Sequence, residues 1–328
     1  MSTSTQVMAM QVHRPGGPEA MRWEPIALAM PGPGQALVRH TAVGLNFLDT
    51  YFRSGLYPMP LPFVPGAEAA GVVEAVGEGV TTVRVGERVA YAGSTGAYAQ
   101  ARVIEAEALV KLPDDISDTT AAAVLLQGMT ARFLIREVYP VQPGETILLH
   151  AAAGGVGSLL AQWASGLGAR VIGTVSTDEK AEIARENGCA HVIVTAREAI
   201  APRVLELTEG RKLGVVYDSV GRDTFAASLD CLRPRGTLVV FGQSSGTIDP
   251  LEINLLGRKG SLFLTRPVMP DFVGTAAQRE VACAELFQAL RDGLVRPRIG
   301  TVRPLSEAVQ AHEDLQARRT AGATVFKP

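Results

Sequence analysis

The chain has 328 residues, of which 47% are hydrophobic and 20% charged, a composition that provides a large apolar core and argues against intrinsic disorder. The formal net charge of −2 gives no electrostatic basis for binding nucleic acid or an anionic membrane. Three cysteines, Cys189, Cys231 and Cys283, have no paired spacing, which excludes a disulfide framework and a thiolate zinc site and is typical of a reducing compartment.

The amino-terminal residues lack the basic and apolar segments of a secretory signal, and no apolar run reaches membrane-spanning length. We therefore expect a cytoplasmic protein without a membrane segment. The length suggests about two domains.

The first part of the chain has the pattern of short strands separated by turns that contain glycine or proline. Strands are predicted over 35–40, 70–76 and 88–91. This pattern favours a partly open β-barrel over a series of βα units.

The pattern changes at residue 119, where a helical stretch begins that runs to 135. After it come an apolar strand over 145–150, a glycine-rich turn, a helix over 158–168 and a second strand over 170–175. Strand, turn, helix and strand form one βαβ unit of the size that a dinucleotide-binding fold needs.

The turn between them, residues 151–157, reads Ala-Ala-Ala-Gly-Gly-Val-Gly, with Ala152 at the first glycine position of the usual G-x-G-x-x-G pattern. Without a Cβ, Gly154 and Gly155 allow the backbone to turn sharply and approach a pyrophosphate, and Gly157 lets the helix lie close to the strand. The free N–H groups and the dipole of the helix face the anion. The alternative is a tight strand-to-helix connection that binds no ligand.

The remaining elements continue the alternation of strand and helix. The predicted strands lie at 191–194, 213–218 and 237–241, and the predicted helices at 178–187, 197–208 and 223–232. We expect a doubly wound parallel sheet. Ser176 is the predicted cap of the 178–187 helix, with Glu179 completing a capping box and Gly188 ending the helix.

The last part of the chain lies beyond the final strand expected for this sheet. Two amphipathic helices are predicted over 278–294 and 305–319, and a closing strand over 323–326. We therefore assign these elements to the first domain.

Several stretches together with the glycine-rich turn resemble the medium-chain dehydrogenase/reductase superfamily and, more closely, its zeta-crystallin-like quinone oxidoreductase branch. These stretches are residues 43–51 (VGLNFLDTY), 54–58 (SGLYP), 216–223 (VYDSVGRD), 241–245 (FGQSS) and 265–267 (TRP). The resemblance implies an α/β protein with a GroES-like, partly open β-barrel catalytic domain at 1–126 and a Rossmann domain at 127–264. Residues 265–328 would return to the catalytic domain. It also implies a homodimeric, NADPH-dependent reductase of quinones or similar conjugated carbonyls.

Zinc-dependent alcohol dehydrogenases are the nearest competitors within the superfamily. They carry Gly-His-Glu where this chain has Gly66-Ala67-Glu68, and Ala67 offers no donor atom to a metal that needs about three protein ligands. No cysteine precedes Cys189. We expect no metal, and chemistry that depends on the bound cofactor.

By the same resemblance, Asn46 lies near the nicotinamide, and Tyr51 and Tyr57 line the substrate cleft. An amide or a phenol can donate a hydrogen bond to a developing oxyanion without titrating near neutral pH. Asp49 is expected to orient this group beside the cofactor. The alternatives are that the tyrosines only pack and that Asp49 forms a turn. His150, at the end of a strand, is predicted to be a packed histidine.

The resemblance implies further cofactor contacts. They come from Thr130, from Gly154, Gly155, Val156 and Gly157 in the turn, from Ser219 after one strand, and from Phe241, Gly242, Gln243 and Ser244 after the next. The last two groups follow the carboxyl ends of strands, where open α/β sheets bind ligands. Relatives often have a tyrosine where this chain has Thr195, so no ring contact with the adenosine is expected there.

The preference for NADPH is predicted from the end of the second strand of the βαβ unit. Ser176 and Thr177 stand there without a carboxylate, which NAD sites use to bind the ribose, and Lys180 follows one helical turn later. Asp178 lies in the first turn of the next helix, where it complements the helix dipole. Hydroxyls and a lysine suit the 2′-phosphate, and the resemblance adds Arg318.

Two other functions remain open. An enal or enone reductase uses the same hydride and a similar cleft. A cofactor-binding protein with a structural or RNA-binding role is the alternative from another class, although the chain has no basic stripe interleaved with aromatic residues and only 5% aromatic residues. The expected partner is a small-molecule quinone or conjugated carbonyl, and no nucleic acid.

Overall fold

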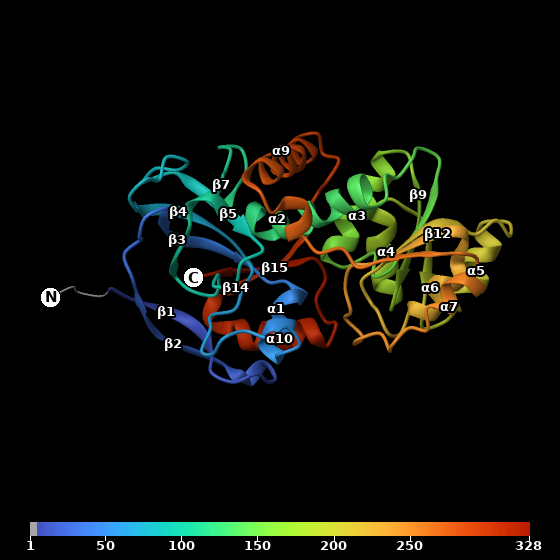
Figure 1. The fold of residues 1–328 in the computed structure, drawn as a ribbon, viewed down its shortest axis with the longest axis horizontal. Helices are drawn as coiled ribbons and strands as arrows, with labels where there is room; N and C mark the ends of the chain where they lie inside the picture. Colours follow the sequence, from blue (N-terminus) through green and yellow to red (C-terminus); the bar gives the residue numbers. More distant parts are fainter. Residues whose placement is uncertain (1–4) are drawn as a thin grey trace. The chain divides into compact units, whose positions relative to one another are not determined.

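The computed structural model describes residues 5–328, which form two compact units (Figure 1). The first, called here the barrel unit, contains the described residues up to Leu126 together with Thr275–Ala284 and Pro297–Pro328. The second, the Rossmann unit, contains Gln127–Gly274 and Glu285–Arg296.

The predicted domain boundary at residue 265 stays a prediction, and the compact units divide the chain a little later. Residues up to 274 group with the Rossmann unit because they follow its last strand directly. The segment 285–296 groups with it because Glu285 accepts two hydrogen bonds from the guanidinium of Arg132, at 2.9 and 3.1 Å. Leu286 also packs so closely on Gly128 that a Cβ there would lie 2.5 Å from it.

The strands of the barrel unit pair in antiparallel fashion, except for one parallel pair formed by residues 299–304 and 323–327. A two-stranded sheet pairs β1 (Thr5–Val12) with β2 (Met21–Leu28). A seven-stranded sheet has the order β14-β15-β3-β4-β5-β7, with β6 also pairing with β3. Its strands are β3 (Gln35–Gly44), β4 (Glu68–Val76), β5 (Arg88–Ala92), β6 (Ala101–Glu105), β7 (Val110–Lys111), β14 (Ile299–Pro304) and β15 (Ala323–Lys327). The strands predicted at 35–40, 70–76, 88–91 and 323–326 lie within β3, β4, β5 and β15.

Helices complete the barrel unit. They are η1 (Pro18–Ala20), α1 (Phe47–Ser54), η2 (Ala106–Ala108), η4 (Leu305–Glu307) and α10 (Ala308–Gln316), with parts of α2 (Asp118–Phe133) and α9 (Ala276–Arg291). The core is apolar, with Val38, Val73, Val89 and Phe326 from four strands fully buried in one cluster. Helix α1 was not predicted from the sequence. Two candidate site residues, Asp49 and Tyr51, lie on it, and a third, Asn46, is its N-cap.

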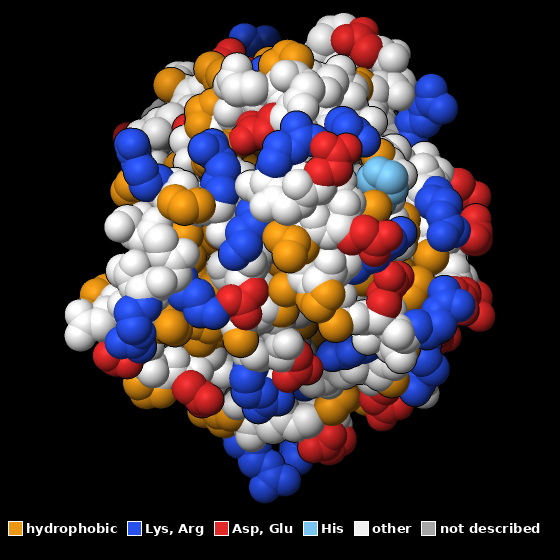
Figure 2. Space-filling view, turned by 90° about the vertical axis from the view of Figure 1, so that its right-hand side faces the viewer, with side chains coloured by type: hydrophobic (Ala, Val, Ile, Leu, Met, Phe, Trp, Pro, Cys, Tyr) orange, Lys and Arg blue, Asp and Glu red, His pale blue; other side chains and the backbone are white. Residues whose placement is uncertain are grey.

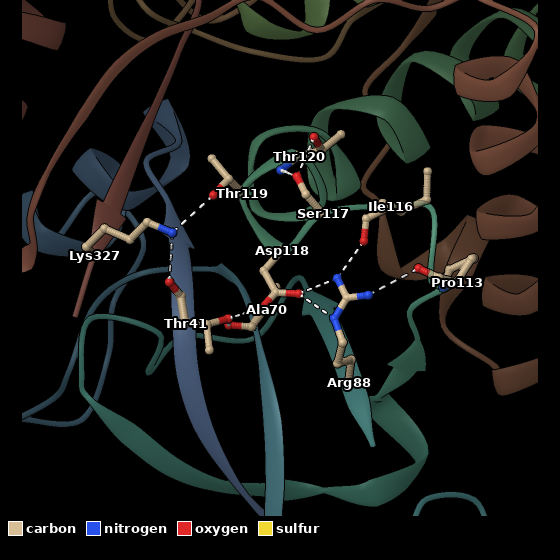
Figure 3. A network of polar contacts seen from close by, with 10 residues as sticks. All are labelled: Thr41, Ala70, Arg88, Pro113, Ile116, Ser117, Asp118, Thr119, Thr120 and Lys327. Atoms are coloured by element: carbon tan, nitrogen blue, oxygen red, sulfur yellow. Dashed lines mark hydrogen bonds and ion pairs between the residues drawn. The ribbon is translucent and has the colours of Figure 1, made fainter. Parts of the chain in front are cut away.

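The start of α2 is fixed to the barrel sheet by the polar network in Figure 3. The carboxylate of Asp118 accepts two hydrogen bonds from Arg88 on β5, at 2.6 and 3.0 Å, and one from the hydroxyl of Thr41 on β3, at 2.5 Å. Ser117 accepts the N–H of Thr120 at 3.1 Å and so caps the helix. Lys327 of β15 donates to the hydroxyl of Thr119 at 3.1 Å. Three strands thereby hold one helix end.

The Rossmann unit contains a six-stranded, entirely parallel sheet of order β10-β9-β8-β11-β12-β13. Its strands are β8 (Thr146–Leu149), β9 (Arg170–Val175), β10 (Cys189–Val194), β11 (Leu213–Asp218), β12 (Leu232–Val240) and β13 (Phe263–Thr265). The strand order reverses between β8 and β11, and ligands bind at such a switch point. The predicted α/β fold with a doubly wound sheet is confirmed.

Helices connect these strands (Figure 1). They are η3 (Leu134–Val138), which continues α2, then α3 (Gly155–Gly166), α4 (Asp178–Glu186), α5 (Ile200–Leu207), α6 (Phe225–Cys231), α7 (Asn254–Arg258) and α8 (Pro270–Val273). Leu148, Ile172, Ile193 and Val216 project from the central strands into one buried cluster. Within residues 5–328, no helix is both long and apolar enough to span a membrane.

Candidate functional site

The glycine-rich turn connects β8 to α3, and its backbone leaves amide groups available at the start of the helix. Gly154 is the N-cap and, having no side chain, provides no capping hydrogen bond. The N–H of Ser158 donates to the carbonyl of Gly154 at 2.8 Å, so the N–H groups of Gly155, Val156 and Gly157 have no partner inside the helix. This helix end, with its positive dipole, fits a phosphate group.

The space available for a side chain differs among the three glycines of the turn. A Cβ on Gly157 would lie 2.2 Å from the carbonyl oxygen of Ala151, so helix and turn are too close for any side chain. A Cβ on Gly155 would lie 2.5 Å from the Gln127 side chain, a reason that the sequence did not reveal. A Cβ on Gly154 would meet only Ala151, whose oxygen lies at 3.1 Å. Of the three positions, Gly154 is therefore the one where an added Cβ would be least crowded.

The residues predicted to recognise the 2′-phosphate follow β9. Thr177 is the N-cap of α4, and its hydroxyl accepts the N–H of Lys180 at 3.4 Å. The predicted cap at Ser176 is therefore wrong by one residue, because the backbone becomes helical only at Asp178, and the capping box with Glu179 does not form. Gly188 follows the helix with φ +90°, as predicted.

The acid nearest to this strand end is neutralised by a cation. The carboxylate of Asp178 forms an ion pair with Arg197, which follows β10. Thr195, at the same edge, donates its hydroxyl to the carbonyl of Val175 at 3.1 Å and so joins the ends of β9 and β10. The hydroxyl of Thr177 and the half-buried Lys180 thus remain the polar groups suited to an anion beside this end of β9.

The loops after β11 and β12 contain Ser219 and Phe241–Ser244, and they are bonded to each other. The N–H of Phe241 donates to the carbonyl of Asp218 at 2.8 Å, and the N–H of Ser244 to that of Ser219 at 3.1 Å. A Cβ on Gly242 would lie 2.7 Å from the carbonyl oxygen of Ser219. The structure therefore brings these predicted residues together, with Gln243 half-buried between them.

Asp218 holds the start of the loop after β11, a role that was not predicted from the sequence. Its fully buried carboxylate accepts hydrogen bonds from the N–H groups of Val220 and Gly221 and from the hydroxyls of Thr224 and Ser228. Four donors offset the cost of burying the charge. His150 lies behind Ser228 and is fully buried, and this burial lowers the pKa of its imidazole. His150 is thus a packed histidine, as predicted.

Asn46 and its neighbours lie in the barrel unit. Asn46 is the N-cap of α1, and its backbone N–H donates to Oδ2 of Asp49 at 2.9 Å. The side-chain Nδ2 of Asn46 donates to Oε2 of Glu68 at 2.7 Å, and the N–H of Leu126 donates to the other oxygen at 2.8 Å. Burial raises the pKa of Asp49 to about 7 and that of Glu68 to about 8.

Asp49 is fully buried, and its contact with a cofactor stays a prediction. Its Oδ2 also accepts the hydroxyl of Tyr98 at 3.0 Å, so the carboxyl holds the start of α1 and faces the interior of the barrel unit. The N3 position of a helix commonly carries such an acid, which reaches back to the N-cap. Asp49 therefore supports the backbone of Asn46 at the start of α1.

Tyr51 and Tyr57 are both half-buried and lie edge to face, with ring centroids 5.3 Å apart. Phe47 packs on Tyr51 and Phe52 on Tyr57, each in a tilted, edge-on geometry. The N–H of Tyr57 donates to the carbonyl of Tyr51 at 3.0 Å. The structure thus gathers Asn46, at the start of α1, and both tyrosines on one helix and the turn that follows it.

Two further predicted cofactor residues lie on other elements. Thr130 is half-buried on α2 and belongs to the Rossmann unit. Arg318 is exposed, follows α10 in the barrel unit and has a left-handed backbone with φ +59°. Because Lys180 belongs to the other unit, a joint contact of Lys180 and Arg318 with one phosphate stays a prediction.

Two protein families match parts of this chain. Residues 32–114 match the alcohol dehydrogenase GroES-like domain, and residues 155–277 match the zinc-binding dehydrogenase family. The zinc of the second description has no donor set here. Ala67 is fully buried and has no ligand atom, and within residues 5–328 no three His, Cys, Asp or Glu side chains converge as a metal site. The residues do not fit a catalytic zinc, which needs about three such ligands.

Full-length relatives are similar over nearly the whole chain. A quinone oxidoreductase of Pseudomonas aeruginosa is 50% identical over 95% of this chain and 97% of its own length. A 2-haloacrylate reductase of Burkholderia sp is 46% identical over 98% of this chain and 99% of its own. The crystal structure of Escherichia coli quinone oxidoreductase complexed with NADPH matches 98% of this chain and 100% of that chain, with a TM-score of 0.96 and 42% identity. The chain therefore belongs to the quinone oxidoreductase family of the medium-chain dehydrogenase/reductase superfamily.

Proposed function

We propose that this protein is a zinc-independent reductase that uses NADPH to reduce quinones. The observation that carries the proposal is the turn at Gly154, where α3 begins without a side-chain cap and its first N–H groups have no partner inside the helix. The likeness to quinone oxidoreductases, one of them solved with NADPH, supports the same reading.

The Rossmann unit has the groups that would hold this cofactor. The amides of Gly155, Val156 and Gly157 suit the pyrophosphate, since they lack partners inside α3. Thr177 and Lys180 suit the 2′-phosphate, because the nearby Asp178 is already paired with Arg197. The loops at Ser219 and Phe241–Ser244 lie at carboxyl ends of strands, where the nicotinamide half binds in folds of this type.

When bound, NADPH supplies the hydride. The groups of this chain would then act on the substrate oxygen, which gains negative charge as the quinone is reduced. Asn46, Tyr51 and Tyr57 can donate hydrogen bonds to that oxygen, and neither an amide nor a phenol loses its proton near neutral pH. Asp49 and Glu68 take part indirectly, by holding the backbone and the amide of Asn46.

A reductase of conjugated double bonds is the second candidate, because a 2-haloacrylate reductase is 46% identical to this chain. Both reactions need a hydride and a donor to a conjugated oxygen, and they differ in the atom that accepts the hydride. NADPH oxidation with a benzoquinone, a naphthoquinone, an enone and 2-haloacrylate separates them. Higher kcat/KM with quinones supports the first proposal, higher kcat/KM with the enone or acrylate supports the second, and no turnover with any of them contradicts both.

We further propose a homodimer that forms through the Rossmann unit. Strand β13 is the last strand of its sheet, and an unpaired edge of this kind invites pairing. Phe263 on it is 57% exposed, and Val268 and Ile253 nearby in sequence are also exposed. Light scattering on the wild type and on Phe263→Lys tests this: a dimer that becomes monomeric supports the proposal, and a wild-type monomer contradicts it.

Small-molecule turnover, and not nucleic-acid binding, is the expected activity. On the face drawn in Figure 2, basic and acidic side chains are interspersed, as on an ordinary solvated surface. Cys189, Cys231 and Cys283 are buried and none of the three forms a disulfide, which supports a reducing compartment such as the cytoplasm.

A further inference from the structure

A network of buried polar side chains connects α10 to the start of α1 in the barrel unit. Nη1 of Arg53 lies 3.1 Å from Nδ1 of His312, Nε2 of His312 lies 3.0 Å from the hydroxyl of Tyr98, and that hydroxyl lies 3.0 Å from Oδ2 of Asp49. Arg53, Tyr98, His312 and Asp49 are all buried to within 1%. The last of them accepts the N–H of Asn46.

The direction of every hydrogen bond in this network follows from Arg53, at one end of it. A guanidinium can only donate, so Nδ1 of His312 must accept and its proton must be on Nε2. The imidazole is neutral, because burial and the charge of Arg53 lower its pKa to about 3. Nε2–H then donates to the oxygen of Tyr98, whose only proton is left for Asp49. Each group thereby has one possible orientation.

The network is also held in place at its Arg53 end. Arg53 donates from Nε to the carbonyl of Gly16 at 3.2 Å and from Nη2 to the amide oxygen of Gln316 at 3.0 Å. The ring of Tyr98 is packed edge-on against Phe326 and lies against the backbone of Gly66, where a Cβ would be 2.1 Å away. Neither the guanidinium nor the phenol can turn to another partner without breaking these contacts.

We propose that Tyr98 is a positioning residue: with His312 it holds the carboxyl of Asp49, and through it the N-terminus of α1 and Asn46. The hydroxyl of Tyr98 acts through Asp49 and not by touching the substrate. This inference rests on the proposed function only in assigning the reaction to Asn46. The placement of Asn46 itself can be measured without any turnover.

The barrel unit contains a matched control. Tyr91 is equally buried, and its hydroxyl lies 2.9 Å from Nε2 of His40. Nδ1 of His40 lies 2.7 Å from the carbonyl of Ala99, so here Nδ1 carries the proton and the tyrosine hydroxyl donates to the histidine. Neither the Tyr91–His40 hydrogen bond nor the His40–Ala99 hydrogen bond involves Asp49 or Asn46. Tyr91→Phe therefore removes one buried tyrosine–histidine hydrogen bond without touching α1.

The experiment compares Tyr98→Phe with Tyr91→Phe. We expect both variants to lower the melting temperature. Only Tyr98→Phe should lower kcat for quinone reduction, by about tenfold, which corresponds to losing one hydrogen bond that supports the site, with little change in KM for NADPH. In the absence of cofactor, only Tyr98→Phe should shift the backbone amide resonance of Asn46 and speed its hydrogen exchange.

Equal losses of kcat in both variants, or an unchanged Asn46 resonance in Tyr98→Phe, would overturn the proposal. If the wild type does not reduce quinones, the proposed function fails, and the Asn46 resonance still decides the role of Tyr98. If Tyr98→Phe does not fold, His312→Gln and His312→Leu replace it. Gln keeps a donor toward Tyr98 and should retain the wild-type resonance of Asn46, whereas Leu should not, and identical spectra for the two would count against the proposal.

Discussion

Replacing Gly154 by serine should raise or preserve the stability of the protein while weakening its affinity for NADPH. Gly154 is the N-cap of α3, a position that prefers Ser, Thr, Asp or Asn because their side chains accept an N–H of the first helical turn. The backbone there has φ −80° and ψ 177°, which serine adopts without strain. The added Cβ would lie 3.1 Å from the Ala151 oxygen, a contact that a small shift relieves.

The same hydroxyl would compete with the cofactor for these amides. A charge-assisted hydrogen bond to a phosphate contributes about 1.5–3 kcal/mol, so the affinity for NADPH should fall about 10- to 150-fold. The serine cap itself should change the free energy of unfolding by only a few tenths of a kcal/mol, since a glycine cap is nearly as good. Isothermal titration with NADPH and urea unfolding of the apoprotein measure the two quantities.

Gly157→Ala provides the contrast. Its Cβ would lie 2.2 Å from a backbone oxygen that cannot rotate away, so it should cost about 1–3 kcal/mol of stability, as overpacked sites do. If Gly154→Ser binds NADPH as tightly as the wild type, the turn is only a structural connection. The reasoning about the open helix end would then be refuted.

Three further predictions follow from single contacts. Lys180→Ala should lower kcat/KM for NADPH about 10- to 150-fold and leave kcat/KM for NADH nearly unaffected. Ser176→Asp should move the preference toward NADH. Equal effects on both cofactors would contradict the assignment of the end of β9 to the 2′-phosphate. Asp218→Asn turns an amide N–H₂ toward groups that donate to the carboxylate, so chemical denaturation should show a loss of about 1–3 kcal/mol, and an unchanged midpoint would count against the support role. The pKa of the His312 imidazole is lowered from 6.5 to about 3, so neutral His312 contributes fully to stability above pH 6.5 and this contribution is lost as the pH falls toward 3. The stability advantage of the wild type over His312→Gln should therefore shrink between pH 6.5 and 3, by up to about 1.4 kcal/mol per pH unit. A difference that stays constant over this range would refute the prediction.

Local patterns in the sequence were sufficient to predict most of the Rossmann unit. Strand β9 at 170–175 and strand β11 at 213–218 have the predicted bounds, because a buried parallel strand reads as a short apolar run between polar turns. Strand β13 was missed because it has only three residues and lies at an exposed edge. Helix α1 was missed because its eight residues lie among strands, and short helices depend on tertiary contacts.

The candidate site could be predicted only in part. Motifs identified Asn46, the tyrosines and the glycine-rich turn, since each lies within a short run of residues. The groups around Asn46 are not all local: Glu68, which accepts its side-chain amide, is 22 residues away. Tyr98, which donates to Asp49, is 214 residues from its own partner His312. Such pairs arise from the way strands and helices pack, which periodicity does not encode. The N-cap of α4 shows a smaller limit: by residue type Ser is the better cap, yet the structure uses Thr177 and not Ser176.

The most direct test of the proposed function is the stoichiometry of NADPH oxidation with a naphthoquinone, followed anaerobically by the loss of NADPH and the appearance of quinol. The account predicts quinone-dependent oxidation that yields one quinol per NADPH, is far slower with NADH, and is unaffected by dialysis against EDTA. Oxidation that requires added zinc, that proceeds better with NADH, or that is absent with every quinone tried would contradict it.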